Sequence, residues 1–379
     1  MELDSKKIFK TLNPNKVWIP ILFGLAIVFY QFYTDDSINA DTLNLIFTAK
    51  AIPFIFAILL ILARFLGYMY RIRAISSDEL SWGSSLYIII LWEFASAVTP
   101  SVVGGTAVAV FILLKEGINM GKSLAFVMLT AILDNLFFVV AALISLIVAP
   151  GEMFPGNLNT MDGIEENNLM FGGLRPVFYV SYFLIVLYTF IMFYALFVRP
   201  RAFKWFLLKV TSIRYLRKWR YSAYEHGNEI IWASSNIKGK DINYWIHIAL
   251  ATVFIWSVRY LQLNVLIQAY SENSLIDHLI IYSRQVILWI TMLVAPTPGG
   301  SGFAEYFFES FFSEYLRDHT LVIMVLWRIL SYYPFLLLGA IFLPRWIKRV
   351  FFKKKDEKKS PEDSLSPVKE SDLTGQDNS

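Results

Sequence analysis

Two segments decide the fold of this chain: Thr99-Pro100-Ser101-Val102-Val103-Gly104-Gly105 and Pro296-Thr297-Pro298-Gly299-Gly300-Ser301-Gly302. The first interrupts an apolar region at 84–114, and the second interrupts another at 276–313. Proline removes a backbone donor and glycine weakens a helix, so each segment predicts a break between two helical limbs. The fold then depends on how these broken regions alternate with the unbroken ones.

The unbroken apolar runs predict membrane-spanning helices. The chain has 379 residues, of which 56% are hydrophobic, and it contains no cysteine for disulfides or thiolate metal sites. Continuous apolar runs occupy 17–33, 45–66, 123–149, 177–198, 243–266 and 320–343. A run of about 20 apolar residues can cross the hydrocarbon core, and these runs lack the alternation of a β-barrel. The predicted fold class is therefore an all-α integral membrane protein.

Positive charge predicts the orientation of these helices. Basic residues precede the first run, follow the second run at Arg71 and Arg73, crowd the segment 199–240 and begin the C-terminal tail. The loops 34–44 and 150–176 are acidic instead. We read the first run as an uncleaved signal-anchor. We expect a multi-pass protein of the cell inner (cytoplasmic) membrane with both termini in the cytoplasm.

The parity of the crossings then predicts re-entrant hairpins. If 84–114 crossed the membrane once, the basic segment 199–240 would lie outside. The limbs 84–98 and 101–114 would each be about 21–22 Å long, which is too short for a full span. We therefore expect this hairpin to open to the cytoplasm and 276–313 to open to the outside. The longer first limb of 276–313 leaves two full spans as an alternative there.

The resulting order predicts an inverted repeat. The two halves, about 15–150 and 176–345, each contain three spans and one re-entrant broken-helix hairpin, in opposite orientations. Interrupted helices in matching positions are typical of transporters and indicate the binding site. The alternative is that proline and glycine are simply common in membrane helices. The membrane domain would cover 1–350, and the polar segment 351–379 predicts a disordered cytoplasmic tail.

The segment 200–240 is predicted as a cytoplasmic basic amphipathic segment. Within 200–220, apolar residues recur at helical spacing (Phe203, Phe206, Leu207, Val210, Ile213, Leu216), and basic residues occupy the other face. This pattern predicts one helix that lies on an anionic leaflet. Its position between two spans argues against a nucleic-acid partner.

The breaks and the ionisable residues within apolar runs form the candidate substrate-binding site. A new half-helix would start near 105 and near 302, and its free N–H groups would favour a phosphate or carboxylate. The candidate residues are Glu93, Thr99, Pro100, Gly104, Gly105, Asp134, Arg284, Thr297, Pro298, Gly299, Gly300, Ser301, Glu305 and Arg328.

We expect Arg284 and Arg328 to contact a head-group phosphate, and Glu93, Asp134 or Glu305 to take a proton or cation. The alternative is that these residues form internal ion pairs, with threonine and serine hydroxyls capping the half-helices. Arg64 and Arg259 lie near the ends of apolar runs, so we expect them to extend to the interface.

Signatures of catalysis are sparse. The four histidines are widely spaced, and no zinc-protease, nucleophile-elbow or phosphate-loop motif is present. We therefore predict no catalytic residue, metal or cofactor, and any transport would be gradient-driven or downhill. Two alternatives stay open: an enzyme that modifies a lipid head group with Glu93 and Asp134, and a non-catalytic envelope scaffold.

The same motifs resemble the lysylphosphatidylglycerol synthase transmembrane (flippase-like) family. The resemblance covers about 15–345 and is carried by Glu93-Phe94 with the first break, Leu113-Leu114-Lys115-Glu116-Gly117, the second break through Glu305, and Arg328, Tyr332 and Gly339. It implies binding or translocation of an anionic phospholipid or lipid-linked substrate at a midplane site between two broken helices. Fused members carry an aminoacyl-transferase domain, whereas only a short tail follows 345, so lysyl transfer is not expected of this stand-alone member. Thr106-Ala107-Val108-Ala109 also stands where many relatives have a charged residue.

Overall fold

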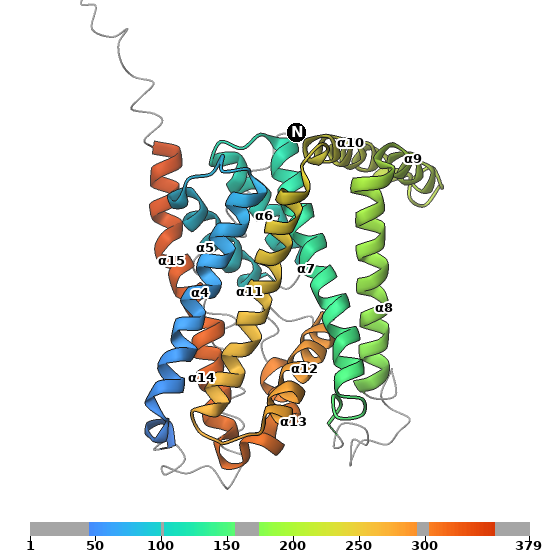
Figure 1. The fold of residues 1–379 in the computed structure, drawn as a ribbon. Helices are drawn as coiled ribbons and strands as arrows, with labels where there is room; N and C mark the ends of the chain where they lie inside the picture. Colours follow the sequence, from blue (N-terminus) through green and yellow to red (C-terminus); the bar gives the residue numbers. More distant parts are fainter. Residues whose placement is uncertain (1–44, 100–101, 156–173, 294–302, 353–379) are drawn as a thin grey trace, which may run out of the picture.

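A computed structural model describes residues 45–99, 102–155, 174–293 and 303–352 (Figure 1). Every regular element among these residues is a helix, as predicted. Within these described ranges, six helical segments are long and apolar enough to cross a membrane: Ala51–Ile75, Met120–Val148, Arg175–Val198, Ile242–Gln268, Leu275–Met292 and Thr320–Val350. The predicted run 17–33 and the tail 353–379 lie outside the described residues.

The described residues form the following helices, in chain order. They are η2 Leu45–Thr48, α4 Ala51–Ile75, α5 Trp82–Val98, α6 Val102–Lys115, α7 Met120–Val148, α8 Leu174–Phe193, η4 Tyr194–Val198, α9 Pro200–Val210, η5 Arg217–Trp219, α10 Arg220–Ile237, α11 Ile242–Gln268, α12 Leu275–Met292, α13 Phe303–Leu316, η7 Arg317–His319, α14 Thr320–Ser331, α15 Tyr333–Ile347 and η8 Lys348–Phe352.

The two broken regions lie in opposite halves of the molecule. In Figure 1, α5 and α6 lie in the half that carries α9 and α10, here named the basic end, and α12 and α13 lie toward the opposite, far end. At 1.5 Å per residue, α5 is about 25 Å long, and α6 and α13 are each about 21 Å long. The inverted repeat itself stays a prediction, because its first span at 17–33 lies outside the described residues.

Three predicted boundaries were wrong. The run predicted at 45–66 continues as α4 to Ile75, because Arg71 and Arg73 find polar partners and need not leave the helix. The run 320–343 lies within the candidate span Thr320–Val350, but its helix is interrupted at Tyr332, whose φ of −124° and ψ of −57° are not helical. Pro334 follows, lacks an N–H and crowds the carbonyl four residues earlier, which accounts for this break.

The third wrong boundary is the single helix predicted over 200–220. Instead, α9 ends at Val210, and the chain turns before η5 and α10. The hydroxyls of Thr211 and Ser212 donate to the carbonyls of Leu207 and Lys209 at 2.7 and 2.6 Å. Such bonds compete with the helical pattern and help to end α9.

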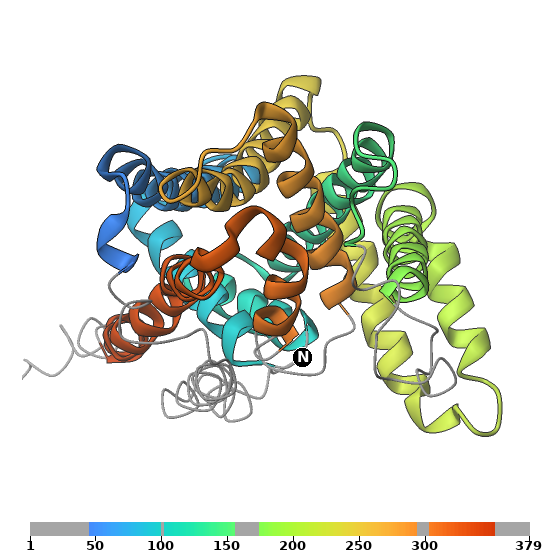
Figure 2. The same ribbon diagram turned by 90° about the horizontal axis from the view of Figure 1, so that it is seen from below.

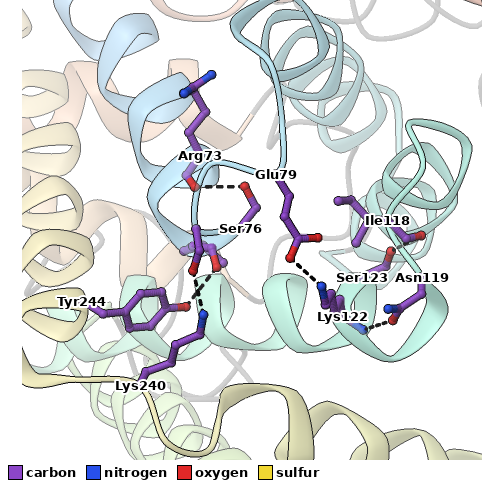
Figure 3. A network of polar contacts seen from close by, with 11 residues as sticks. Arg73, Ser76, Glu79, Ile118, Asn119, Lys122, Ser123, Lys240 and Tyr244 are labelled. Atoms are coloured by element: carbon purple, nitrogen blue, oxygen red, sulfur yellow. Dashed lines mark hydrogen bonds and ion pairs between the residues drawn. The ribbon is translucent and has the colours of Figure 1, made fainter.

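Side chains at the basic end cap the helices and join the loops (Figure 3). The Asn119 side chain accepts from the backbone N–H of Lys122 at 2.9 Å, which sets the start of α7. The Lys122 ammonium also pairs with Glu79 in the α4–α5 loop. The Lys240 ammonium donates to Ser77 at 2.7 Å from the start of α11. Three loops from different parts of the chain are therefore tied together.

The buried apolar side chains form two separate cores. One core joins the basic-end parts of α4, α7 and α11 to α5, α6 and α15. The other joins their far-end parts to α8, α12, α13 and α14. On α4, Ala57 belongs to the far core and Tyr68 to the basic-end core. On α7, Phe138 belongs to the far core and Ile132 to the basic-end core. A layer of polar residues lies between these cores.

Candidate functional site

One face of α4 supplies the positive charge of the polar layer. Arg64, Tyr68 and Arg71 are four and three residues apart, so they lie on the same side of the helix. Their exposed fractions are only 1%, 6% and 3%. α4 packs lengthwise against α11, which lies beside it in Figures 1 and 2. This face therefore points into the protein, between α11, α5 and α7.

Arg71 is fully engaged by its neighbours. Both terminal nitrogens contact the Asp134 carboxylate, with NH2 donating to Oδ2 at 3.3 Å. NH1 also donates to the Thr252 hydroxyl at 3.2 Å. Trp256 Nε1 donates to Asp134 Oδ1 at 2.8 Å. These contacts fix Arg71 and Asp134 where α4, α7 and α11 meet.

Arg64 is less well satisfied, although it is more deeply buried. NH2 donates to Glu93 Oε2 at 3.3 Å, and Nε and NH1 have no hydrogen-bond partner among the described residues. Its guanidinium carbon lies 4.9 Å from the Phe335 ring centroid and 5.4 Å from that of Tyr68. Two aromatic rings thus lie beside a guanidinium that has spare hydrogen-bond donors. Sequence reasoning had placed Arg64 at the interface, and that prediction was wrong.

Arg259 adds a third positive charge. Its side chain is partly buried and interacts electrostatically with Tyr68 and Glu93. Its guanidinium carbon lies 5.0 Å from the Trp256 ring centroid. The neighbouring Tyr260 hydroxyl is buried and has no hydrogen-bond partner among the described residues. The polar layer around α4 therefore contains three arginines (Arg64, Arg71 and Arg259) and two carboxylates (Glu93 and Asp134). Its formal charge is one positive unit.

A second ion pair lies beside the second predicted break. Glu305, in the first turn of α13, pairs with Arg328 of α14 at 2.7 Å, and both residues are buried. The Arg328 guanidinium carbon lies 5.1 Å from the Tyr332 ring centroid. The Tyr332 hydroxyl donates to the carbonyl of Ala97 near the end of α5, at 2.9 Å. Residues beside both predicted breaks are therefore linked through α14 and α15.

Arg284 forms its hydrogen bonds away from the polar layer. Its Nε donates to the Glu152 carbonyl at 2.8 Å, and NH1 donates to the Phe311 carbonyl and to Glu314 at 2.9 and 3.0 Å. These bonds tie α12 to α13 and to the segment that follows α7. The described contacts do not bring Arg284 to Glu93 or Asp134.

The predicted residues at the breaks are only partly described. Pro100, Thr297, Pro298, Gly299, Gly300 and Ser301 lie outside the described residues. Gly104 and Gly105 lie in the first turn of α6, and a Cβ on Gly105 would meet Ser96 Oγ at 2.5 Å, so α5 and α6 pack closely there. The Thr99 hydroxyl donates to the Ala95 carbonyl at 2.7 Å within α5.

Two acids that sequence reasoning selected as candidates lie in the polar layer, but their arginine partners were not predicted. Glu93 and Asp134, weighed as a catalytic pair, are each paired with a different arginine. Tyr68 and Arg71 were not candidates at all. The spacing of Arg64, Tyr68 and Arg71 on one helical face was the available signal. Among the described ranges, no group of three or more His, Cys, Asp or Glu residues could hold a metal ion.

Comparison with known proteins covers nearly all of this architecture. The family described as the lysylphosphatidylglycerol synthase TM region matches residues 17–339. A protein of Archaeoglobus fulgidus, named UPF0104 membrane protein, is 27% identical over 345 residues. That alignment covers 85% of this chain and 94% of the relative. The matched region contains all of the polar layer described above.

Proposed function

The chain belongs to the family of lysylphosphatidylglycerol synthase TM regions, and from this premise we propose that it binds an anionic phospholipid or lipid-linked substrate in the polar layer and moves it between leaflets. The observation that carries the proposal is the buried Arg64 guanidinium, two of whose nitrogens have no hydrogen-bond partner in the part of the chain that the structure describes. We also propose that the basic end faces the cytoplasm, following the distribution of positive charge.

The charge balance of the layer supports an anionic ligand. Arg64, Arg71 and Arg259 outnumber Glu93 and Asp134 by one charge. An unpaired charge away from water costs several kcal/mol, and an arriving phosphate would supply the missing counter-charge. Guanidinium matches phosphate in planar, paired hydrogen bonds. A phosphate head group therefore fits Arg64 better than a cation or a neutral sugar.

The carboxylates border the more open part of the layer. The Glu93 and Asp134 side chains are 25% and 21% exposed, whereas those of Arg64 and Arg71 are 1% and 4% exposed. A head group that enters beside Glu93 would compete with this carboxylate for Arg64. The long Arg64–Glu93 contact of 3.3 Å is the weaker of the two pairs and the easier to exchange. Phe335 would lie beside the bound group.

The test uses the full chain in proteoliposomes with fluorescent phosphatidylglycerol, and chemical quenching of the outer leaflet reports translocation. Arg64→Gln/Glu93→Gln removes both charges of the pair together, so neither is left buried alone. Hydrogen bonds to charged groups are worth about 1.5–3 kcal/mol, so we expect a loss of translocation of about tenfold or more. Arg175→Gln, an exposed arginine on α8, is the matched control and should leave transport unchanged.

Native mass spectrometry of the same proteins separates binding from transport. The unaltered chain should retain anionic lipid, and the double variant should lose it. Equal transport by the double variant and the unaltered chain would refute the assignment of the site. Lipid retention without any translocation by the unaltered chain would refute transport and leave only binding.

A further inference from the structure

The α9–α10 hairpin leaves the membrane-crossing part of the fold abruptly. The candidate span that contains α8 ends at Val198, and α9 begins at Pro200. In Figure 1 both helices run crosswise to the spans, and Figure 2 shows them projecting sideways past α8. Because the span ends where the hairpin starts, the hairpin lies at the level of a bilayer surface.

The hairpin carries strong positive charge that no carboxylate of the described residues pairs with. Residues 199–220 contain eight basic residues and no Asp or Glu: Arg199, Arg201, Lys204, Lys209, Arg214, Arg217, Lys218 and Arg220. Within the described ranges, none of the eight forms an ion pair. The two acids of α10 are engaged within that helix, Glu229 with His226 at 2.9 Å and Glu225 with Tyr221. The Glu229 carboxylate, which hydrogen-bonds to the imidazole, raises the pKa of His226.

Exposed aromatic rings accompany these charges. None of the α9 residues is buried, and Trp205 and Phe206 are 62% and 54% exposed. Lys209 Nζ lies 5.0 Å from the Trp205 ring centroid, and Lys218 Nζ lies 4.6 Å from that of Trp219. Tryptophan and basic residues together are typical of the interface between water and lipid.

We infer that the α9–α10 hairpin binds the anionic head groups of one leaflet and concentrates these lipids beside α8. This surface is separate from the polar layer and does not depend on the proposed transport. Charge complementarity identifies the partner, because each Lys or Arg near an anionic membrane contributes a factor of about five in affinity. A purely aromatic hairpin would bind neutral lipid equally well.

The cysteine-free sequence allows a direct test on the full chain. A donor fluorophore is attached at Ser222→Cys, an exposed position of α10, and the protein is placed in nanodiscs of equimolar phosphatidylcholine and phosphatidylglycerol. Energy transfer is measured to acceptor-labelled phosphatidylglycerol and, separately, to acceptor-labelled phosphatidylcholine. We expect anionic lipid to be enriched near the probe and the enrichment to fall as salt is raised.

Two double variants decide the role of the hairpin charges. Lys209→Gln/Lys218→Gln should lower the enrichment at least fivefold. Arg345→Gln/Lys348→Gln removes two exposed charges at the same end of the molecule and should leave the enrichment unchanged. Thermal unfolding checks that both variants are folded. Equal transfer to the two lipids, or equal loss in the two variants, would overturn the inference.

Removal of the polar segment that follows Phe352 provides a further check. This segment contains seven acidic residues: Asp356, Glu357, Glu362, Asp363, Glu370, Asp372 and Asp377. If enrichment occurs only in the truncated chain, the hairpin binds this segment rather than lipid in the full protein, and the inference fails. Equal enrichment with and without the segment supports the leaflet as the partner.

Discussion

At the scale of single residues, two arginines of one helix differ in how they are satisfied. Arg71 donates hydrogen bonds to Asp134 and Thr252, and Asp134 also accepts one from Trp256. The cost of burying Arg71 is therefore compensated within the protein. Arg64 has one long bond to Glu93 and two nitrogens without partners among the described residues. Burial of a charged group is tolerated only when it is paired. Arg71 therefore fits a structural role and Arg64 a ligand-binding one.

The structural role of Arg71 predicts a strong coupling to Asp134. Asp134→Asn leaves a buried guanidinium without its counter-ion and should lower the free energy of unfolding by about 3–5 kcal/mol. Arg71→Gln/Asp134→Asn removes both charges and should recover much of this loss. Reversible denaturant unfolding in micelles measures the four proteins of the cycle. A double variant as unstable as the sum of the two single ones would refute the coupling.

At the scale of elements, the short helices α5 and α15 are held in place by close packing against each other. α15 packs on α5 through Gly339, where an added Cβ would lie 2.3–2.4 Å from three atoms of Phe94, including its Cβ. Phe94 is fully buried and cannot swing away without moving the backbone of α5. Because Phe94 is next to Glu93, this contact also positions one carboxylate of the site.

Gly339→Ala should therefore separate α5 from α15. Overpacking a tight contact costs about 1–3 kcal/mol, so we expect a lower midpoint of thermal unfolding. Gly83→Ala, also on α5, is the matched control, because its nearest neighbour is Ser81 Oγ at 3.9 Å. Removing a glycine there should leave the midpoint unchanged or raise it. Equal midpoints for the two variants would contradict the close packing.

At the scale of the whole molecule, the polar layer lies halfway along the crossing helices. Arg64 is 13 residues after the start of α4 and 11 before its end, and Asp134 is 14 residues from either end of α7. The two apolar cores lie on either side of this level. If each core matches one leaflet of hydrocarbon, the charges lie near the bilayer centre.

Spin labels on lipid-facing positions test this depth. Leu62 of α4 and Leu136 of α7 are 58% and 49% exposed and lie level with the layer, whereas Ile52 and Ile147 are 84% and 78% exposed and lie near the far end. Oxygen concentrates at the bilayer centre, so single-cysteine labels at the first two positions should be the more accessible to oxygen. Greater oxygen accessibility at Ile52 and Ile147 would place the polar layer away from the centre.

The sequence by itself determined the membrane class, the order of the helices and the place of the break between α5 and α6. These features follow from local chemistry: apolar length sets a span, and the proline at position 100 predicts an interruption. Predictions from local sequence were wrong where a residue outside the segment changed the end of a helix. Arg71 stays in α4 because Asp134 pairs with it, and a reading of hydropathy stops the helix before such a residue.

Only the tertiary structure decided which charges belong together. Glu93 and Asp134 were recognised from the sequence, but their partners are 29 and 63 residues away, on a helix whose arginines resembled residues of an interface or a loop. Arg284, another candidate from the sequence, donates hydrogen bonds to the carbonyls of Glu152 and Phe311, which the sequence did not indicate. Hydropathy describes the preference of each residue for water or lipid. An ion pair depends instead on which faces of distant helices pack together, and only the folded chain decides this.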